Sequence, residues 1–149
     1  MKIRKATKRD LKEIAELSYE YGKYENSLDK NVEAPALKRC RELDEYFMKL
    51  GTIYFVIEEE GKIMGVQSVN IRKQGKEKKG VLHTTIITKD ARRKSYGKAL
   101  VNYAIRFFKK KGCLRLDTFV HYKNKNAKKF WEKQGFEMEQ GYIATKKLK

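Results

Sequence analysis

The sequence has little proline, cysteine, histidine or acid, and it has no long apolar run. Its 149 residues include one proline, two cysteines and two histidines, and 19 acidic residues stand against 36 lysines and arginines. No run approaches the roughly 18 apolar residues that a membrane-spanning helix needs, so we expect no membrane segment. The opening stretch "MKIRKATKRD" lacks the apolar core of a secretory signal peptide. We therefore expect a cytoplasmic protein.

The two cysteines argue against a disulfide framework and against a metal site. Cys40 and Cys113 lie far apart in the sequence, and neither belongs to a C-x-x-C pair or to a metal-binding spacing with histidine. We expect two reduced thiols and no bound metal.

What is present suits one folded domain with a basic surface. Hydrophobic residues make up 40% of the chain and aromatic residues 11%, which is enough apolar material for a core. The net charge of +17 indicates an anionic partner, or else a surface that is simply rich in solvated lysine. Nucleic acid, a membrane surface and a phosphorylated cofactor are all anionic partners of this kind.

Short strand patterns and helix patterns alternate along the chain without a break in composition. Thr7 and Asp10 form a T-x-x-D helix entry. The expected elements, in order, are a strand at residues 2–6, helices over about 7–22 and 35–50, strands at 52–59, 63–73 and 81–88, a helix over about 97–111, a strand at 114–120, a helix at 126–134 and a hairpin over 136–148. An apolar stripe on the second helix comprises Leu37, Cys40, Leu43, Phe47 and Leu50. This order predicts an α/β fold on a mostly antiparallel meander.

The stretch "TKDARRKSYGKAL", residues 88–100, reads as a strand end, a tight turn and a helix start. The first turn of a helix offers free backbone N–H groups and the positive end of the helix dipole. Ser95 and Gly97 are small enough for an anion to approach the backbone, and Arg92, Arg93 and Lys94 add positive charge. The stretch therefore predicts a phosphate or pyrophosphate site.

Two common nucleotide motifs do not fit this stretch. It lacks residues that the Walker A loop and the G-x-G-x-x-G fingerprint both require. The pattern Arg92-x-x-Ser95-x-Gly97 instead resembles the coenzyme A pyrophosphate loop of the GCN5-related N-acetyltransferase (GNAT) superfamily. "NKNAKKFWEKQGF", residues 124–136, resembles that superfamily's second cofactor motif through the pattern Asn124-x-x-Ala127-x-x-Phe130-Trp131-x-x-x-Gly135-Phe136.

The resemblance implies a mixed, mostly antiparallel sheet of about seven strands, splayed in the middle and flanked by about four helices. It also implies acetyl-coenzyme A as cofactor, with its pantetheine arm in the gap between two strands. By position, Thr85, Ile86 and Ile87 would bind the pantetheine arm, and Asn124 would meet its pantetheine or phosphate end. The residues expected around the pyrophosphate are Arg92, Arg93, Lys94, Ser95, Tyr96, Gly97 and Lys98.

For the chemistry, the resemblance implies direct acetyl transfer to an amine, and His83 is the leading general base. Arylalkylamine N-acetyltransferases resemble the chain here, with a histidine at the matching position. The alternative is a half-buried structural histidine. Trp131 stands where many members carry the tyrosine that protonates the thiolate, so we expect it to pack against the cofactor. His121 is expected to face the same region as a solvated loop residue.

The acceptor site is expected on the loop of residues 19–34, which has four acids against two lysines. Tyr21, Tyr24 and Glu25 would suit a cationic amine such as a polyamine, an aminoglycoside or a lysine side chain. Two other readings stay open: a basic module that binds RNA or ribosomes, which the scattered lysines do not favour, and a coenzyme A-binding relative without turnover. A homodimer is also left open.

Overall fold

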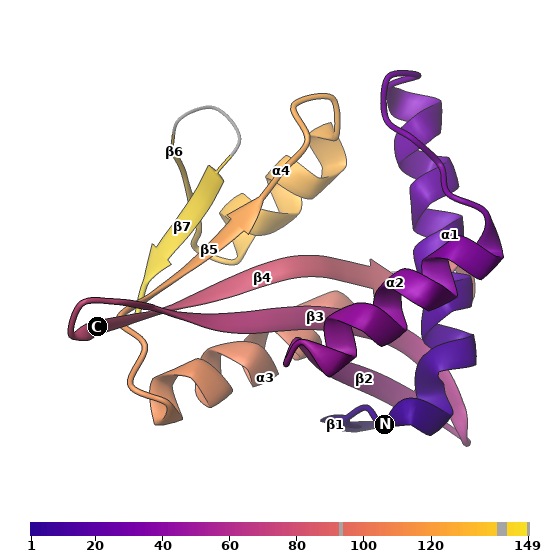
Figure 1. The fold of residues 1–149 in the computed structure, drawn as a ribbon. Helices are drawn as coiled ribbons and strands as arrows, with labels where there is room; N and C mark the ends of the chain where they lie inside the picture. The colour runs from indigo at the N-terminus through magenta and orange to yellow at the C-terminus, as the bar shows by residue number, and fades with distance from the viewer. Residues whose placement is uncertain (93, 140–142, 149) are drawn as a thin grey trace.

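The computed structural model describes residues 1–92, 94–139 and 143–148, and they form one seven-stranded sheet with four α-helices (Figure 1). The strands are β1 (Lys2–Lys5), β2 (Ile53–Glu59), β3 (Lys62–Gln74), β4 (Glu77–Ile87), β5 (Arg115–Phe119), β6 (Glu137–Glu139) and β7 (Ile143–Lys147). The helices are α1 (Leu11–Leu28), α2 (Leu37–Lys49), α3 (Tyr96–Lys110) and α4 (Lys125–Lys133). The strand order is β1-β2-β3-β4-β5-β7-β6, and β4 with β5 is the parallel pair in an otherwise antiparallel sheet. The predicted fold class is confirmed.

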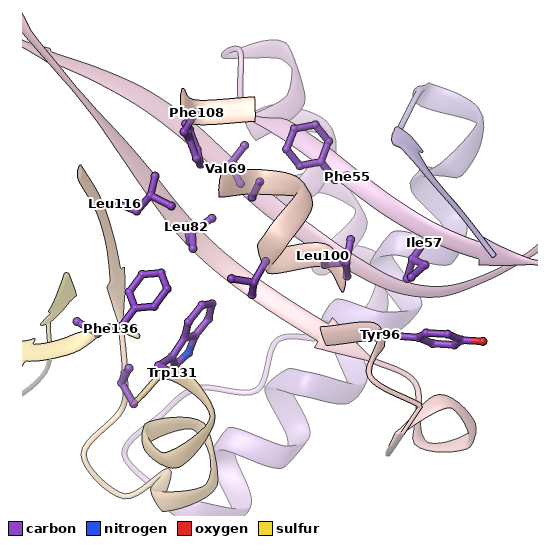
Figure 2. Close-up of a cluster of buried hydrophobic side chains, with 14 of the residues drawn as sticks. Phe55, Ile57, Val69, Leu82, Tyr96, Leu100, Phe108, Leu116, Trp131 and Phe136 are labelled. Atoms are coloured by element: carbon purple, nitrogen blue, oxygen red, sulfur yellow. The ribbon is translucent and has the colours of Figure 1, made fainter. Parts of the chain in front are cut away.

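The two faces of the sheet bury separate apolar clusters. Along β2, Tyr54 and Val56 point into the cluster that α1 covers, whereas Phe55 and Ile57 point into the cluster that α3 and α4 cover. This alternation follows from the two-residue repeat of a strand. Figure 2 shows the larger cluster, in which Trp131 of α4 lies with the residues of the sheet and α3.

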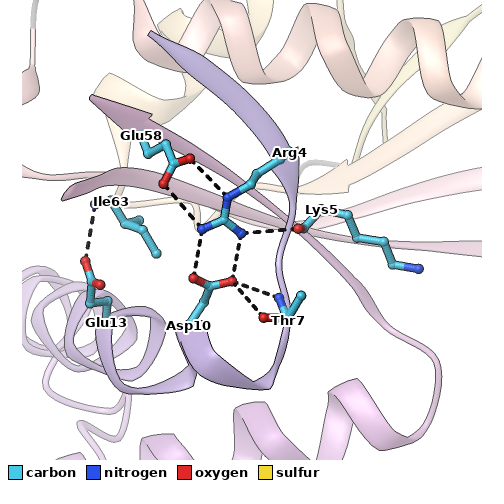
Figure 3. Close-up of polar contacts among 7 residues, drawn as sticks. All are labelled: Arg4, Lys5, Thr7, Asp10, Glu13, Glu58 and Ile63. Atoms are coloured by element: carbon cyan, nitrogen blue, oxygen red, sulfur yellow. Dashed lines mark hydrogen bonds and ion pairs between the residues drawn. The ribbon is translucent and has the colours of Figure 1, made fainter. Parts of the chain in front are cut away.

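A buried ionic contact fixes the start of α1 to the sheet (Figure 3). The Arg4 guanidinium on β1 donates two hydrogen bonds of 2.9 Å to the Asp10 carboxylate and further bonds to Glu58 on β2. Asp10 also accepts the Thr7 backbone N–H at 2.8 Å, as the predicted helix entry requires. The Asp10 carboxylate thus caps the helix start and binds Arg4 on β1, and the Arg4 guanidinium extends the contact to β2.

Two helices differ from the sequence-based expectation. α1 continues past Gly22 to Leu28, with Gly22 packed beside Pro35 and the last turns of the helix lining a cleft. The apolar stripe of α2 is only partly buried: Cys40 is buried, but the exposed fraction is 43% for Phe47 and 64% for Leu50. Hydrogen bonds from Ser18 and Tyr54 to Asp44 turn a different side of α2 toward the protein.

β4 and β5 separate partway along their length. Their parallel register ends at the pair Leu82 and Thr118, and in Figure 1 the two strands diverge toward the end where α1 stands. On its other side β4 carries a bulge at the same point, because Leu82 pairs with Val69 and Thr84 with Ser68, leaving His83 without a partner in that register. The predicted splay is therefore present, and His83 lies at its start.

Candidate active site

A cleft of about 810 Å³ opens where β4 and β5 part. Its walls come from both sides of the sheet. The α1 side contributes Tyr21, Tyr24 and Glu25, β4 contributes residues 83–87, and the start of α3 and the inner side of α4 close the other end. The cleft therefore joins the predicted cofactor loop to the predicted acceptor residues.

At the α3 end, the chain turns sharply into the helix. Ser95 has the left-handed conformation, with φ of 62°, directly before the helix begins at Tyr96. Gly97 lines the cleft, and a Cβ there would lie 3.3 Å from the ring of Phe130, so a larger residue would crowd α4. Arg92 also lines the cleft. This end presents the free N–H groups of a helix start beside a cation, which suits a pyrophosphate.

Other residues expected at the pyrophosphate lie elsewhere. The Tyr96 side chain is buried and its hydroxyl donates to Glu59, pointing away from Trp131 in Figure 2. Lys94 borders a second, smaller cavity beside Glu59, and Lys98 is exposed outside the lining of the cleft. The side chains of these three residues therefore do not line the cleft, and the Lys94 backbone N–H already donates to the Ala91 carbonyl at 3.3 Å. Arg93 lies outside the described residues.

The middle of the cleft runs along the open edge of β4. Thr85, Ile86 and Ile87 line it, as expected for residues that meet an extended arm. The Thr85 hydroxyl accepts a hydrogen bond of 2.8 Å from Gln67, which is fully buried on β3. Beyond Leu82 this stretch has no register with β5 in the described part of the chain, so the backbone groups that point away from β3 are available to a ligand.

α4 forms the opposite wall. Asn124 is buried, and its side-chain oxygen caps the helix by accepting the Ala127 backbone N–H at 3.1 Å. Trp131 is buried too, with its ring 5.0 Å from those of Phe130 and Phe136. Both predicted residues line the cleft, and the packed indole suits a wall better than a proton donor.

His83 is exposed at the acceptor side of the cleft. Its Nε2 lies 2.6 Å from the Asn70 side-chain oxygen. Partial removal from water, and then the positive charge of Arg72, lower the pKa of His83. A neutral imidazole at neutral pH is what a general base requires.

The three predicted acceptor residues come together on successive turns of α1. The rings of Tyr21 and Tyr24 are 6.4 Å apart. Burial raises the pKa of the Glu25 carboxyl, although the His121 charge and a hydrogen bond from Tyr21 oppose this effect. Burial, and then the negative charge of Glu25, raise the pKa of Tyr21. An acid beside aromatic faces is a suitable environment for an ammonium group.

His121 is a residue whose setting the sequence-based reading missed. It is not a solvated loop residue, because it lines the cleft and its Nε2 lies 3.2 Å from Asp29, just after α1. Its Nδ1 accepts the Lys123 backbone N–H at 3.1 Å, so Nε2 must carry the hydrogen that points to Asp29. The contact joins α1 to the loop after β5, and no local spacing in the sequence signals it.

In the described part of the chain, no helix is long and apolar enough to cross a bilayer. Nor do the described histidine, cysteine and acidic residues form any group of three that could hold a metal ion.

Comparison with known proteins gives the family. The model of the acetyltransferase (GNAT) domain matches residues 3–145. An uncharacterised N-acetyltransferase of Methanocaldococcus jannaschii is 32% identical over 139 residues, which is 91% of this chain, and the chain spans 60% of that relative's length.

Solved structures agree on the fold. A possible acetyltransferase from Clostridium difficile has a TM-score of 0.81 at 19% identity, over 93% of this chain and 91% of that one. PaiA N-acetyltransferase of Thermoplasma acidophilum, in complex with coenzyme A, has a TM-score of 0.76 at 22% identity, over 98% of both chains. With the family match over nearly its whole length, the chain belongs to the GNAT acetyltransferase family, whose members use acetyl-coenzyme A.

Proposed function

We propose that this chain moves the acetyl group of acetyl-coenzyme A directly to a primary amine of a small molecule or peptide. The observation that carries the proposal is the continuous cleft, which runs from the start of α3, along the open edge of β4, to His83 and α1. The residues suit the carrier: Arg92 and the helix start for the pyrophosphate, and Thr85 to Ile87 for the pantetheine arm.

Different residues of the chain would act as the base, the donor to the carbonyl oxygen and the wall of the cleft. When bound, acetyl-coenzyme A supplies the thioester whose carbonyl carbon the amine nitrogen attacks. His83 takes a proton from the amine nitrogen, and a backbone N–H of β4 near Ile87 can donate to the carbonyl oxygen. The thiolate released from the bound carrier would be protonated by water or by a tyrosine, because the indole of Trp131 supplies no proton at neutral pH.

For the acceptor we propose a cationic amine, such as a polyamine, an aminoglycoside or a similar compound. Glu25 would bind the ammonium group, and Tyr21 and Tyr24 would present aromatic faces to it. The raised pKa of Glu25 fits a carboxyl held partly out of water, where a single opposite charge counts most.

The test is a thiol-release assay with acetyl-coenzyme A across polyamines, aminoglycosides, arylalkylamines and lysine peptides, with His83→Ala alongside. We expect amine-dependent thiol release, and a fall of about 100-fold or more in His83→Ala if this residue is the base. Calorimetry with coenzyme A separates the rival functions. Coenzyme A binding without thiol release would indicate a family member without turnover. If coenzyme A does not bind and polynucleotide binds in a salt-sensitive way, the result would favour the RNA-binding alternative.

A further inference from the structure

His83 occupies a position where the sheet alone does not fix its side chain. Its neighbours Leu82 and Thr84 pair with consecutive residues of β3, so His83 is the extra residue of a bulge. A bulge redirects the side chain it carries and leaves the extra residue outside the ladder. The orientation of the imidazole must therefore come from side-chain contacts.

Asn70 on β3 supplies such a contact. Its side-chain oxygen lies 2.6 Å from His83 Nε2 and accepts a hydrogen bond of 3.1 Å from the Thr52 hydroxyl. Thr52 stands directly before β2, so the contact joins three consecutive parts of the meander. An amide oxygen has no proton to give, so the imidazole must donate, and Nε2 must carry the hydrogen.

The consequence concerns the other ring nitrogen. In a neutral imidazole with hydrogen on Nε2, the free lone pair is on Nδ1. We propose that Asn70 is a positioning residue that holds His83 in the Nε2–H tautomer, so that Nδ1 is the atom that takes the proton from the amine. The role of Nδ1 as the proton acceptor rests on the proposed function, whereas the assignment of the tautomer does not.

Partial removal from water, and then the charge of Arg72, favour a neutral ring at His83. Arg72 lies two residues beyond Asn70 on β3 and disfavours a second proton on the ring. The other titratable side chains that line the cleft are Tyr21, Tyr24 and Glu25 on α1, Arg92 before α3, and His121 and Tyr122 after β5. The neutral form of His83 is therefore favoured, and Asn70 selects which of the two neutral tautomers it adopts.

Nitrogen-15 NMR of the histidine rings tests the tautomer without any acceptor. His83→Gln identifies the His83 signals by their disappearance. Above the pKa of His83 we expect the Nε2–H form in the unaltered protein and a mixture of tautomers in Asn70→Ala. Asn70→Asp keeps an acceptor oxygen and should restore the single form. A dominant Nδ1–H form in the unaltered protein, or identical spectra for the protein and Asn70→Ala, would overturn the proposal.

Kinetics test the role of Nδ1 once an accepted amine is known. Asn70→Ala should lower kcat by about tenfold or more, with little change in the KM for acetyl-coenzyme A, because the base is misoriented while the cofactor end is intact. Asn70→Asp should recover most of the rate, with the acidic limb of the pH profile moved upward by its added negative charge. Gln74→Ala, farther along β3 and exposed, is the matched control and should leave kcat unchanged.

The double variant separates the failure of this inference from that of the proposed function. In a His83→Ala background, Asn70→Ala should lower kcat no further, and an additional loss would contradict action through His83. A fully active His83→Ala protein would refute the role of Nδ1 and the assigned base together, although NMR would still decide the tautomer. Thermal unfolding of each variant shows whether it is folded before its rate is compared.

Discussion

At the scale of single residues, the candidate site combines features that sequence motifs predict with others that they cannot. Arg92, Gly97, Asn124 and Trp131 line the cleft because the two cofactor motifs place them at fixed points of a helix start and a helix wall. The partner of His83 could not be predicted. Asn70 contacts it across the β3–β4 pairing, beside a bulge for which the sequence has no local signal.

The charge of Arg72 leads to a prediction for pH dependence. Partial removal from water is the main cause that lowers the pKa of His83, and Arg72 adds to it, so the unprotonated base should persist below the ordinary histidine pKa of 6.5. Arg72→Gln removes part of this effect, raises the pKa of His83 and should move the acidic limb of the kcat/KM profile to higher pH. Lys73→Gln removes the same charge from the other side of β3 and serves as control. Equal shifts in the two variants would mean that net charge, rather than Arg72, sets the pKa.

At the scale of elements, the joint between β1, β2 and α1 depends on one carboxylate. The hydrogen bond from Arg4 is the main cause that lowers the pKa of Asp10 below its ordinary value of 3.8. A lowered pKa means that the folded state favours the ionised carboxyl. The resulting stability is fully present above pH 3.8 and is lost as pH falls through the lower pKa of the folded state.

Asp10→Asn should therefore cost about 1–3 kcal/mol of unfolding free energy at pH 7 and less at pH 3, as measured by urea denaturation. Glu16→Gln is the control, because Glu16 is an exposed acid on α1. A cost that is the same at both pH values would show that the ion pair is not the source of the stability.

The exposed stripe of α2 predicts a contrast between two helices. Ile14 on α1 is fully buried, so Ile14→Ala should lower the unfolding free energy by about 2–5 kcal/mol. Leu50, which follows α2, is 64% exposed, and Leu50→Ala should change it by about 0.5 kcal/mol or less. Denaturant titration of both variants checks this, and a large loss in Leu50→Ala would mean that another surface covers the stripe.

At the scale of the whole molecule, the order of elements was predictable and the placement of side chains was not. Two-residue and helical periodicities give the strands and helices of the meander, and the family motifs give the splay. The orientations of Lys94 and Tyr96 depend on how the turn enters α3, and the contact of His121 with Asp29 joins segments that only the folded chain brings together.

Because the net charge is +17, the contribution of Arg92 to coenzyme A binding must be distinguished from that of the overall positive charge. At 100 times its Kd, coenzyme A should stabilise the folded protein by about 2.7 kcal/mol and raise its Tm by several degrees. Arg92→Glu should reduce that rise, and added salt should weaken binding. Lys147→Glu makes the same change in net charge at an exposed position outside the cleft. If the increase in Tm caused by coenzyme A falls equally in both variants, Arg92 has no specific part in binding.

The parting of β4 from β5 also affects how the protein behaves on its own. A strand edge that lacks a neighbour can pair with the edge of another molecule, and here the unpaired edge of β4 beyond Leu82 lies in the middle of the sheet rather than at its rim. A bound carrier would cover it. Preparations stripped of carrier should therefore self-associate at high concentration, and adding coenzyme A back should return them to single particles in light scattering.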